Sequence, residues 1–173
     1  SITDPAGNET IVAIEQFRNP DGSTVIGPNG GRLVADNGVY LDVPSGAFPS
    51  GAVVKITPLS REDMGLPEWP EWPFVRGFEL SCSEKPQVYL NVSAPLPDGK
   101  GPDAHGVIAK LAQAYGQDAL AAVDTLKVIE GRLATSSPPC PGIFSKFAQY
   151  AMFLNEDEQY ALGEAILFMV PPV

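Results

Sequence analysis

The chain has 173 residues, enough for one domain with a sizeable hydrophobic core and no dependence on a structural metal or a dense disulfide framework. Its net charge is −10 and its basic residues form no cluster, which argues against binding to nucleic acid or insertion into an anionic membrane. A hydrophobic content of 44% accompanies 17 glycines and 18 prolines, a combination typical of short strands joined by tight turns.

Residues 1–20 predict a short strand, because apolar side chains alternate loosely around residues 11–14. The turn sequence RNPDGST follows at residues 18–24, where proline fixes φ and Asp-Gly allows a reversal. We therefore expect residues 1–20 to be a separate strand or tail, and residues 21–173 to form the main domain.

The stretch from Val25 to Gly51 is rich in glycine, and its spacing distinguishes a phosphate-binding loop from a set of turns. A dinucleotide-binding fingerprint needs Gly-x-Gly-x-x-Gly between a strand and a helix, whereas these glycines are spaced differently and lead into a strand. The runs RLVAD and VYLDV flank Asn37-Gly38, which predicts a hairpin with a type I′ turn. Val39, Leu41 and Val43 should then share one face of the sheet.

Further strands are predicted at AVVKITPL (52–59, ended by Pro58), VRGFELSC (75–82) and PQVYLNVSAPLP (86–97). Between the first two, residues 62–74 contain three prolines, which remove ladder donors and predict a loop.

The segment from residue 107 to 129 has helix-forming composition, but Gly116 interrupts it and a hairpin-like turn follows at Glu130-Gly131. We favour strands around residues 107–115 and 123–129. The C-terminal part predicts a strand at residues 145–155 and either a strand or a short helix after an acidic loop. The expected fold class is an all-β antiparallel β-sandwich with little helix.

The order of these pieces resembles a ZU-five-like domain, a β-sandwich module, and in particular its relatives in large secreted bacterial repeat and surface proteins. The resemblance is carried by IGPNGGRLVADNGVYLDVPSGAF with VVKITPL, by GFELSCSEKPQVYLNV and by FSKFAQYAMF, and it covers about residues 24–155. It implies an exported, extracellular or cell-surface location, and residues 1–20 look like the tail of a preceding immunoglobulin-like repeat. The chain begins with no signal-peptide pattern, so we expect a mature or excised piece of a larger protein.

Some members of this family cleave their own backbone at His-Phe-Ser, and the corresponding tripeptide here is Ile143-Phe144-Ser145. A serine hydroxyl needs a neighbouring base to become a nucleophile, and isoleucine cannot accept a proton. The histidine, His105, is remote in sequence. We therefore expect no self-cleavage, and the tripeptide is a vestigial position.

Other chemistry-bearing residues are few. Cys82 and Cys140 could form a disulfide in an exported protein, or remain as two separate buried thiols. Trp69 and Trp72, spaced by Pro-Glu in a stiff loop, could form a platform for a sugar ring or a partner chain, or could cover an open end of the core. Two cysteines and one histidine do not suffice for a structural zinc site, and we expect no metal and no cofactor.

The predicted function is a non-catalytic structural or interaction module, a spacer of a larger exported protein, and no enzyme. Its expected partners are neighbouring domains of the same polypeptide and, at the cell surface, protein or glycan. One alternative is a ligand-binding module that uses Trp69 and Trp72, and a second is a self-cleaving domain at Phe144-Ser145.

Overall fold

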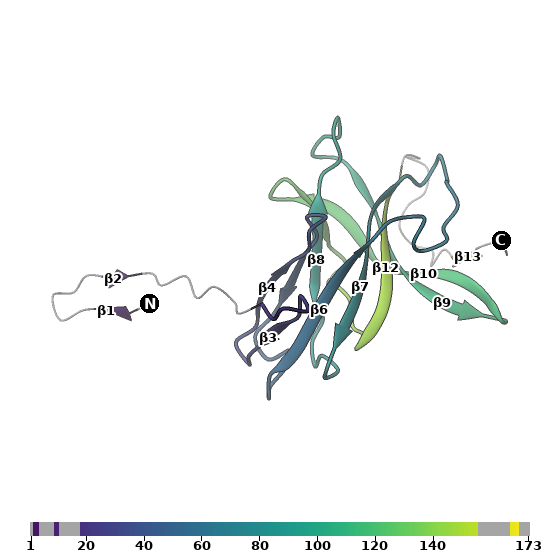
Figure 1. The fold of residues 1–173 in the computed structure, drawn as a ribbon. Helices are drawn as coiled ribbons and strands as arrows, with labels where there is room; N and C mark the ends of the chain where they lie inside the picture. The colour runs from purple at the N-terminus through teal and green to yellow at the C-terminus, as the bar shows by residue number, and fades with distance from the viewer. Residues whose placement is uncertain (1, 4–8, 11–17, 156–166, 170–173) are drawn as a thin grey trace.

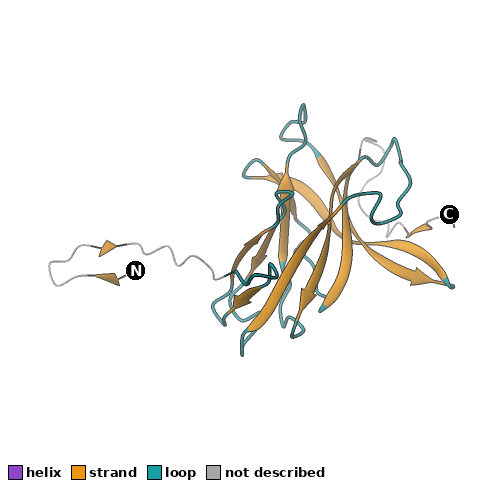
Figure 2. Ribbon diagram, viewed as in Figure 1, coloured by secondary structure: helices purple, strands orange, loops and turns teal. Residues whose placement is uncertain are grey.

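A computed structural model of the chain describes residues 2–3, 9–10, 18–155 and 167–169, and every regular element among them is a β-strand (Figure 2). The strands are β1 (Ile2–Thr3), β2 (Glu9–Thr10), β3 (Thr24–Ile26), β4 (Gly31–Val34), β5 (Tyr40–Val43), β6 (Ala52–Leu59), β7 (Phe74–Cys82), β8 (Asn91–Pro95), β9 (His105–Ala114), β10 (Gln117–Ile129), β11 (Arg132–Thr135), β12 (Phe147–Leu154) and β13 (Leu167–Met169). The prediction of an all-β antiparallel fold is confirmed. The described residues contain no helix that could cross a membrane.

One antiparallel sheet contains most of the described chain (Figure 1). Its strands follow the order β3-β6-β7-β12-β9-β10-β11-β8-β5-β4, and β13 pairs with β10 beside this path. Strands β1 and β2 form a separate antiparallel pair. The strand expected around residues 11–14 and the acidic loop at 156–166 lie outside the described residues.

The long sheet curls over a single inner core, so that strands from the two ends of its order pack on each other. Leu41 of β5, Phe78 of β7 and Leu126 of β10 are fully buried members of one cluster, although their strands are far apart in the sheet order. These distant strands share one core because side chains alternate along a strand, so that every second side chain of each strand points inward. The predicted inward face of Val39, Leu41 and Val43 is confirmed.

A second core lies on the outer face of the same sheet. Ala151 and Phe153 of β12 alternate with inward residues and point outward, where they join Leu120 of β10. Met64 and Leu66, from the loop at residues 60–73, cover this outer face and are themselves buried. The sheet around β9, β10 and β12 is therefore covered by apolar side chains on both faces.

The ambiguous segment between residues 107 and 129 forms the long hairpin of β9 and β10, which confirms strands over helix. Tyr115 and Gly116 both have positive φ (53° and 77°), so the glycine that interrupts the apolar run is the tip of a two-residue turn. Glu130 and Gly131 repeat this geometry (51° and 76°) before β11, as predicted. The register of β10 shifts between Ala122 and Asp124, which turns residues after this bulge to the opposite face.

Three local expectations need correction. The turn between β4 and β5 is not type I′, because Gly38 has positive φ (83°) but Asn37 does not; the loop is longer and closes through a backbone hydrogen bond from Ala35 N to Val39 O. Strand β6 continues through Pro58, which is tolerated because β3 pairs only with residues 52–54 and leaves that edge open. The strand expected from Pro86 begins only at Asn91.

Candidate binding site beneath the 60–73 loop

The loop at residues 60–73 connects β6 to β7 and carries both tryptophans of the chain. Its first turn is held by Asp63, whose carboxylate accepts hydrogen bonds from the backbone N and the hydroxyl of Ser60 (2.9 and 2.8 Å). These bonds lower the pKa of Asp63 and keep it ionised. Arg61 closes the next turn by donating from Nη1 to the carbonyl of Leu66.

Trp69 and Trp72 are half-buried and pack against the outer core. The ring of Trp69 packs edge-to-face on the ring of Phe153 of β12, with centroids 5.8 Å apart. The ring of Phe74 also packs edge-to-face on Phe153, at 6.0 Å. Edge-to-face pairs of this kind stabilise a fold by about 0.5–1.5 kcal/mol beyond the area they bury. The structure thus gives the tryptophans a packing role and leaves part of each ring at the surface.

Two adjoining cavities lie along this loop, with volumes of about 620 and 770 Å³. The first is lined by Trp69 and Trp72 together with the loop prolines, and the second by residues of the β4–β5 turn. Both share Ser60, Phe74, Val75 and Arg76 in their walls, so they form one shallow groove. A groove of this size could hold a small ligand or part of a chain.

The polar side chains of the groove are largely used within the protein. Arg76 donates from Nε to the carbonyl of Asn37 and from Nη1 to that of Val75. Arg61 forms an ion pair with Glu62 (2.8 Å). The Ser60 hydroxyl donates to Asp63, an ionised carboxylate that is a weak base. The arrangement can bind, but it assembles no nucleophile with a base among the described lining residues.

The tripeptide Ile143-Phe144-Ser145 lies just before the start of β12. Ile143 is buried (1% exposed) and exchanges two backbone hydrogen bonds with Leu90. The Ser145 hydroxyl faces Lys110, whose Nζ lies 3.4 Å from it, whereas the His105 ring contacts the carbonyl of Asp103. The structure therefore places Lys110, and not His105, beside the Ser145 hydroxyl.

Cys82 and Cys140 are both free in the structure, so the disulfide considered above is not formed in it. Cys82 ends β7 and belongs to the inner core, and burial raises the pKa of its thiol to about 11. Cys140 is exposed, in the loop that precedes β12. The alternative of two buried thiols also fails, because only Cys82 is buried. No three metal-binding side chains gather among residues 18–155 in a way that would hold an ion.

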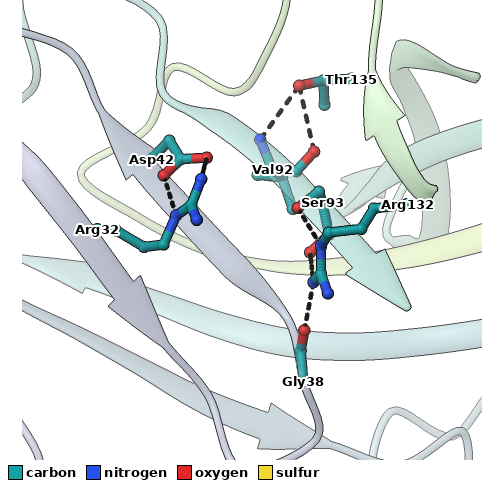
Figure 3. A network of polar contacts seen from close by, with 7 residues as sticks. All are labelled: Arg32, Gly38, Asp42, Val92, Ser93, Arg132 and Thr135. Carbon is teal, nitrogen blue, oxygen red and sulfur yellow. Dashed lines mark hydrogen bonds and ion pairs between the residues drawn. The ribbon is translucent and has the colours of Figure 1, made fainter. Parts of the chain in front are cut away.

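Sequence reasoning missed a polar network on the outer face of strands β4, β5, β8 and β11 (Figure 3). Arg32 binds both carboxylate oxygens of Asp42 across the β4–β5 pair, at 2.6 and 3.0 Å. Arg132 of β11 donates to the Ser93 hydroxyl (2.9 Å) and to the Gly38 carbonyl (2.6 Å). The predicted hairpin puts Arg32 and Asp42 on neighbouring strands, but nothing in the spacing of Gly38, Ser93 and Arg132 indicates that the folded sheet brings these three together.

The ring of Tyr40 contacts both arginines of this network. The guanidinium carbon of Arg132 is 3.6 Å from the centre of the Tyr40 ring, and that of Arg32 is 4.7 Å away. Such cation–π contacts contribute about 0.5–2 kcal/mol each, depending on burial. Burial and the nearby Arg32 charge lower the pKa of Arg132. The network ties the β4–β5 hairpin to β8 and β11, which makes it a structural feature.

Asp124 is a second missed residue. It is buried at the β10 bulge and accepts hydrogen bonds from the backbone N atoms of Thr125, Ser137 and Gly142. One carboxylate thereby fixes the loop between β11 and β12. The sequence signal was present, because Asp124 directly follows the apolar run ALAAV inside the strand, but a carboxylate in a strand can equally face solvent.

Comparison with models of known protein families finds no match to this chain, and comparison with curated proteins finds no relative.

Proposed function

We propose that this chain is a non-catalytic structural module, a rigid spacer with interaction surfaces in a larger exported protein. The resemblance to ZU-five-like domains of secreted bacterial proteins supports the exported location. The proposal depends on one observation: the sheet is covered by apolar side chains on both faces. The inner and outer cores pack on opposite faces of the same strands, β7, β12, β9 and β10. Such a sheet resists bending and local opening, since either would expose apolar surface on two sides.

Single-molecule pulling on full chains linked in tandem tests this role. Because the ladder and both cores must break together, we expect each chain to unfold in one step with a distinct force peak. Gradual extension without a peak, or release of the 60–73 loop well before the sheet, would contradict the proposal.

A second candidate function is ligand binding in the groove beside Trp69 and Trp72, favoured by the adjoining cavities of about 620 and 770 Å³. Exposed tryptophan surface stacks well on sugar rings and on prolines. Titration with neutral and acidic oligosaccharides, followed by tryptophan fluorescence, tests it. Saturable quenching that is lost in Trp72→Ala would favour a binding module, and no response from any sugar would leave the spacer role alone.

The self-cleaving alternative is checked on the same material. We expect the intact mass of the full chain, because Ile143, which cannot accept a proton, stands where the self-cleaving tripeptide has histidine. Two fragments that divide between Phe144 and Ser145 would show that the serine is reactive after all.

A further inference from the structure

Strand β10 has different partners along its two edges. On one edge β9 pairs with it from Gln117 to Lys127, whereas on the other edge β11 pairs only with residues 126–129. Nearer the tip of the β9–β10 hairpin, this second edge is occupied by β13 (Figure 1). The antiparallel register joins Ala119 to Met169, Leu120 to Phe168 and Ala121 to Leu167.

The edge of β10 at residues 119–121, the acceptor edge, belongs to a buried stretch of strand. Ala119 and Leu120 are both fully buried (0% exposed). Because consecutive side chains of a strand point to opposite faces, the strand is covered on both faces here. Backbone N–H and C=O groups at such an edge need partners, and an extended segment supplies them. The acceptor edge therefore favours a further strand.

The strand that occupies this edge is short and is joined to the sheet by a long connection. Strand β13 has three residues, all of them apolar in the sequence. Residues 155–166 connect it to β12, and a segment of this length can span up to about 40 Å when extended. Since β13 lies off the main strand path, its departure breaks no other strand pair that the structure describes. A pairing of this length opens at a small cost in local free energy.

We propose that two copies of the chain exchange β13, so that the C-terminal strand of each copy occupies the acceptor edge of the other. The strand of a second copy carries the same three residues and can take the same register, so each edge keeps the pairing that it has in the single chain. A strand of unrelated sequence has to displace a tethered β13, which acts at a high effective concentration. The second copy is therefore the favoured occupant. None of the paired residues lines the groove beside the tryptophans, so the proposal is independent of ligand binding there.

Cysteine trapping with full chains tests the exchange. One chain carries Ala121→Cys, the other carries Leu167→Cys, and both carry Cys140→Ser to remove the exposed thiol. Directly opposite residues of an antiparallel pair have Cα atoms about 4.5–5.5 Å apart, within the range of a disulfide. After the two chains are mixed at about 1 mM, where exchange competes with the tether, and then oxidised, we expect a covalent dimer that contains one chain of each kind.

Two controls make the result specific. A single chain with both Ala121→Cys and Leu167→Cys should form an internal bridge when it is oxidised at about 10 µM, where the tethered strand dominates. Lys127→Cys replaces Ala121→Cys in the second control, because Lys127 is exposed on the same strand but about 20 Å further along it. This pair should give at least about fivefold less mixed dimer. Thermal unfolding confirms that each variant is folded.

Each other outcome overturns the proposal. An internal bridge without a mixed dimer would show that β13 stays on its own chain. Equal yields from Lys127→Cys and Ala121→Cys would show that the chains are linked by random collision. If neither the internal bridge nor the mixed dimer forms, β13 does not hold the acceptor edge in solution.

Discussion

At the scale of single residues, Asp124 connects β10 to the loop before β12. Its carboxylate accepts three backbone hydrogen bonds in a buried setting, from Thr125, Ser137 and Gly142. An amide at this position can accept two of these, but its NH₂ group would then face the Gly142 donor.

Asp124→Asn should therefore lower the free energy of unfolding by about 2–4 kcal/mol, since a buried donor is left without an acceptor. Chemical denaturation measures this. Asp98→Asn, in an exposed loop, is the matched control and should change stability by less than about 0.5 kcal/mol. Equal stability of Asp124→Asn and the native chain would show that the carboxylate does not hold the loop.

The two thiols should differ in reactivity. Burial raises the pKa of Cys82 to about 11, so at pH 8 only about one molecule in a thousand carries its thiolate. In the folded, unreduced chain one thiol, Cys140, should react with iodoacetamide, and two should react after unfolding. Two unreactive thiols in the unfolded chain would show a disulfide instead.

The raised pKa of Cys82 makes the free energy of unfolding depend on pH. The Cys82 pKa is higher in the folded chain than its ordinary 9.0, so its contribution to stability is complete below pH 9 and is lost as pH rises towards 11. Burial also raises the pKa of Tyr150, which acts in the same direction. The free energy of unfolding should fall between pH 9 and about 11, and Cys82→Ala should flatten part of this fall. A stability that stays constant over this range would contradict the buried thiol.

At the scale of elements, the glycine-rich stretch serves turns and close backbone contacts. Gly30 and Gly46 both have positive φ (76° and 81°), but their surroundings differ. A Cβ at Gly30 would lie 2.0 Å from the carbonyl oxygen of Val43, whereas a Cβ at Gly46 would have nothing within 4 Å.

Gly46→Ala should cost about 1–2 kcal/mol for the backbone conformation alone. Gly30→Ala should cost at least about 1–3 kcal/mol more, because the β4–β5 segment has to move. Thermal or chemical unfolding of both variants gives the difference. Equal losses would mean that the close approach to Val43 is not important.

The sequence predicted the strands better than the connections between them. Period-2 alternation identified β5 and β7 because each has one strongly apolar face. At Asn37-Gly38 the turn chemistry was misread, since the Asn37 side chain is used to donate to the Gly77 carbonyl on β7, a contact between segments far apart in the chain. A local pattern cannot contain such a contact.

The candidate site was predicted only in part. Trp69 and Trp72 were singled out by composition, and their spacing in a proline-rich loop was informative. The packing of Trp69 on Phe153 could not be predicted, because it depends on which face of β12 points outward and on which loop covers that face. Arg132 and Asp124 were missed for the same reason: each acts on residues of another strand or loop.

At the scale of the whole molecule, one sheet serves two cores. The inner core draws on strands from both ends of the sheet order, and the outer core joins the 60–73 loop to β12, β9 and β10. Shared strands couple the two cores, because the side chains of β12 alternate between them. The loop with the tryptophans should therefore unfold together with the sheet.

The most direct test follows denaturation by two signals at once. Tryptophan fluorescence reports only the 60–73 loop, since both tryptophans lie there, and far-ultraviolet circular dichroism reports the sheet. The two-core account predicts one cooperative transition with the same midpoint by both signals. A fluorescence change at clearly lower denaturant, with the sheet still intact, would make the loop a separable lid and contradict the account.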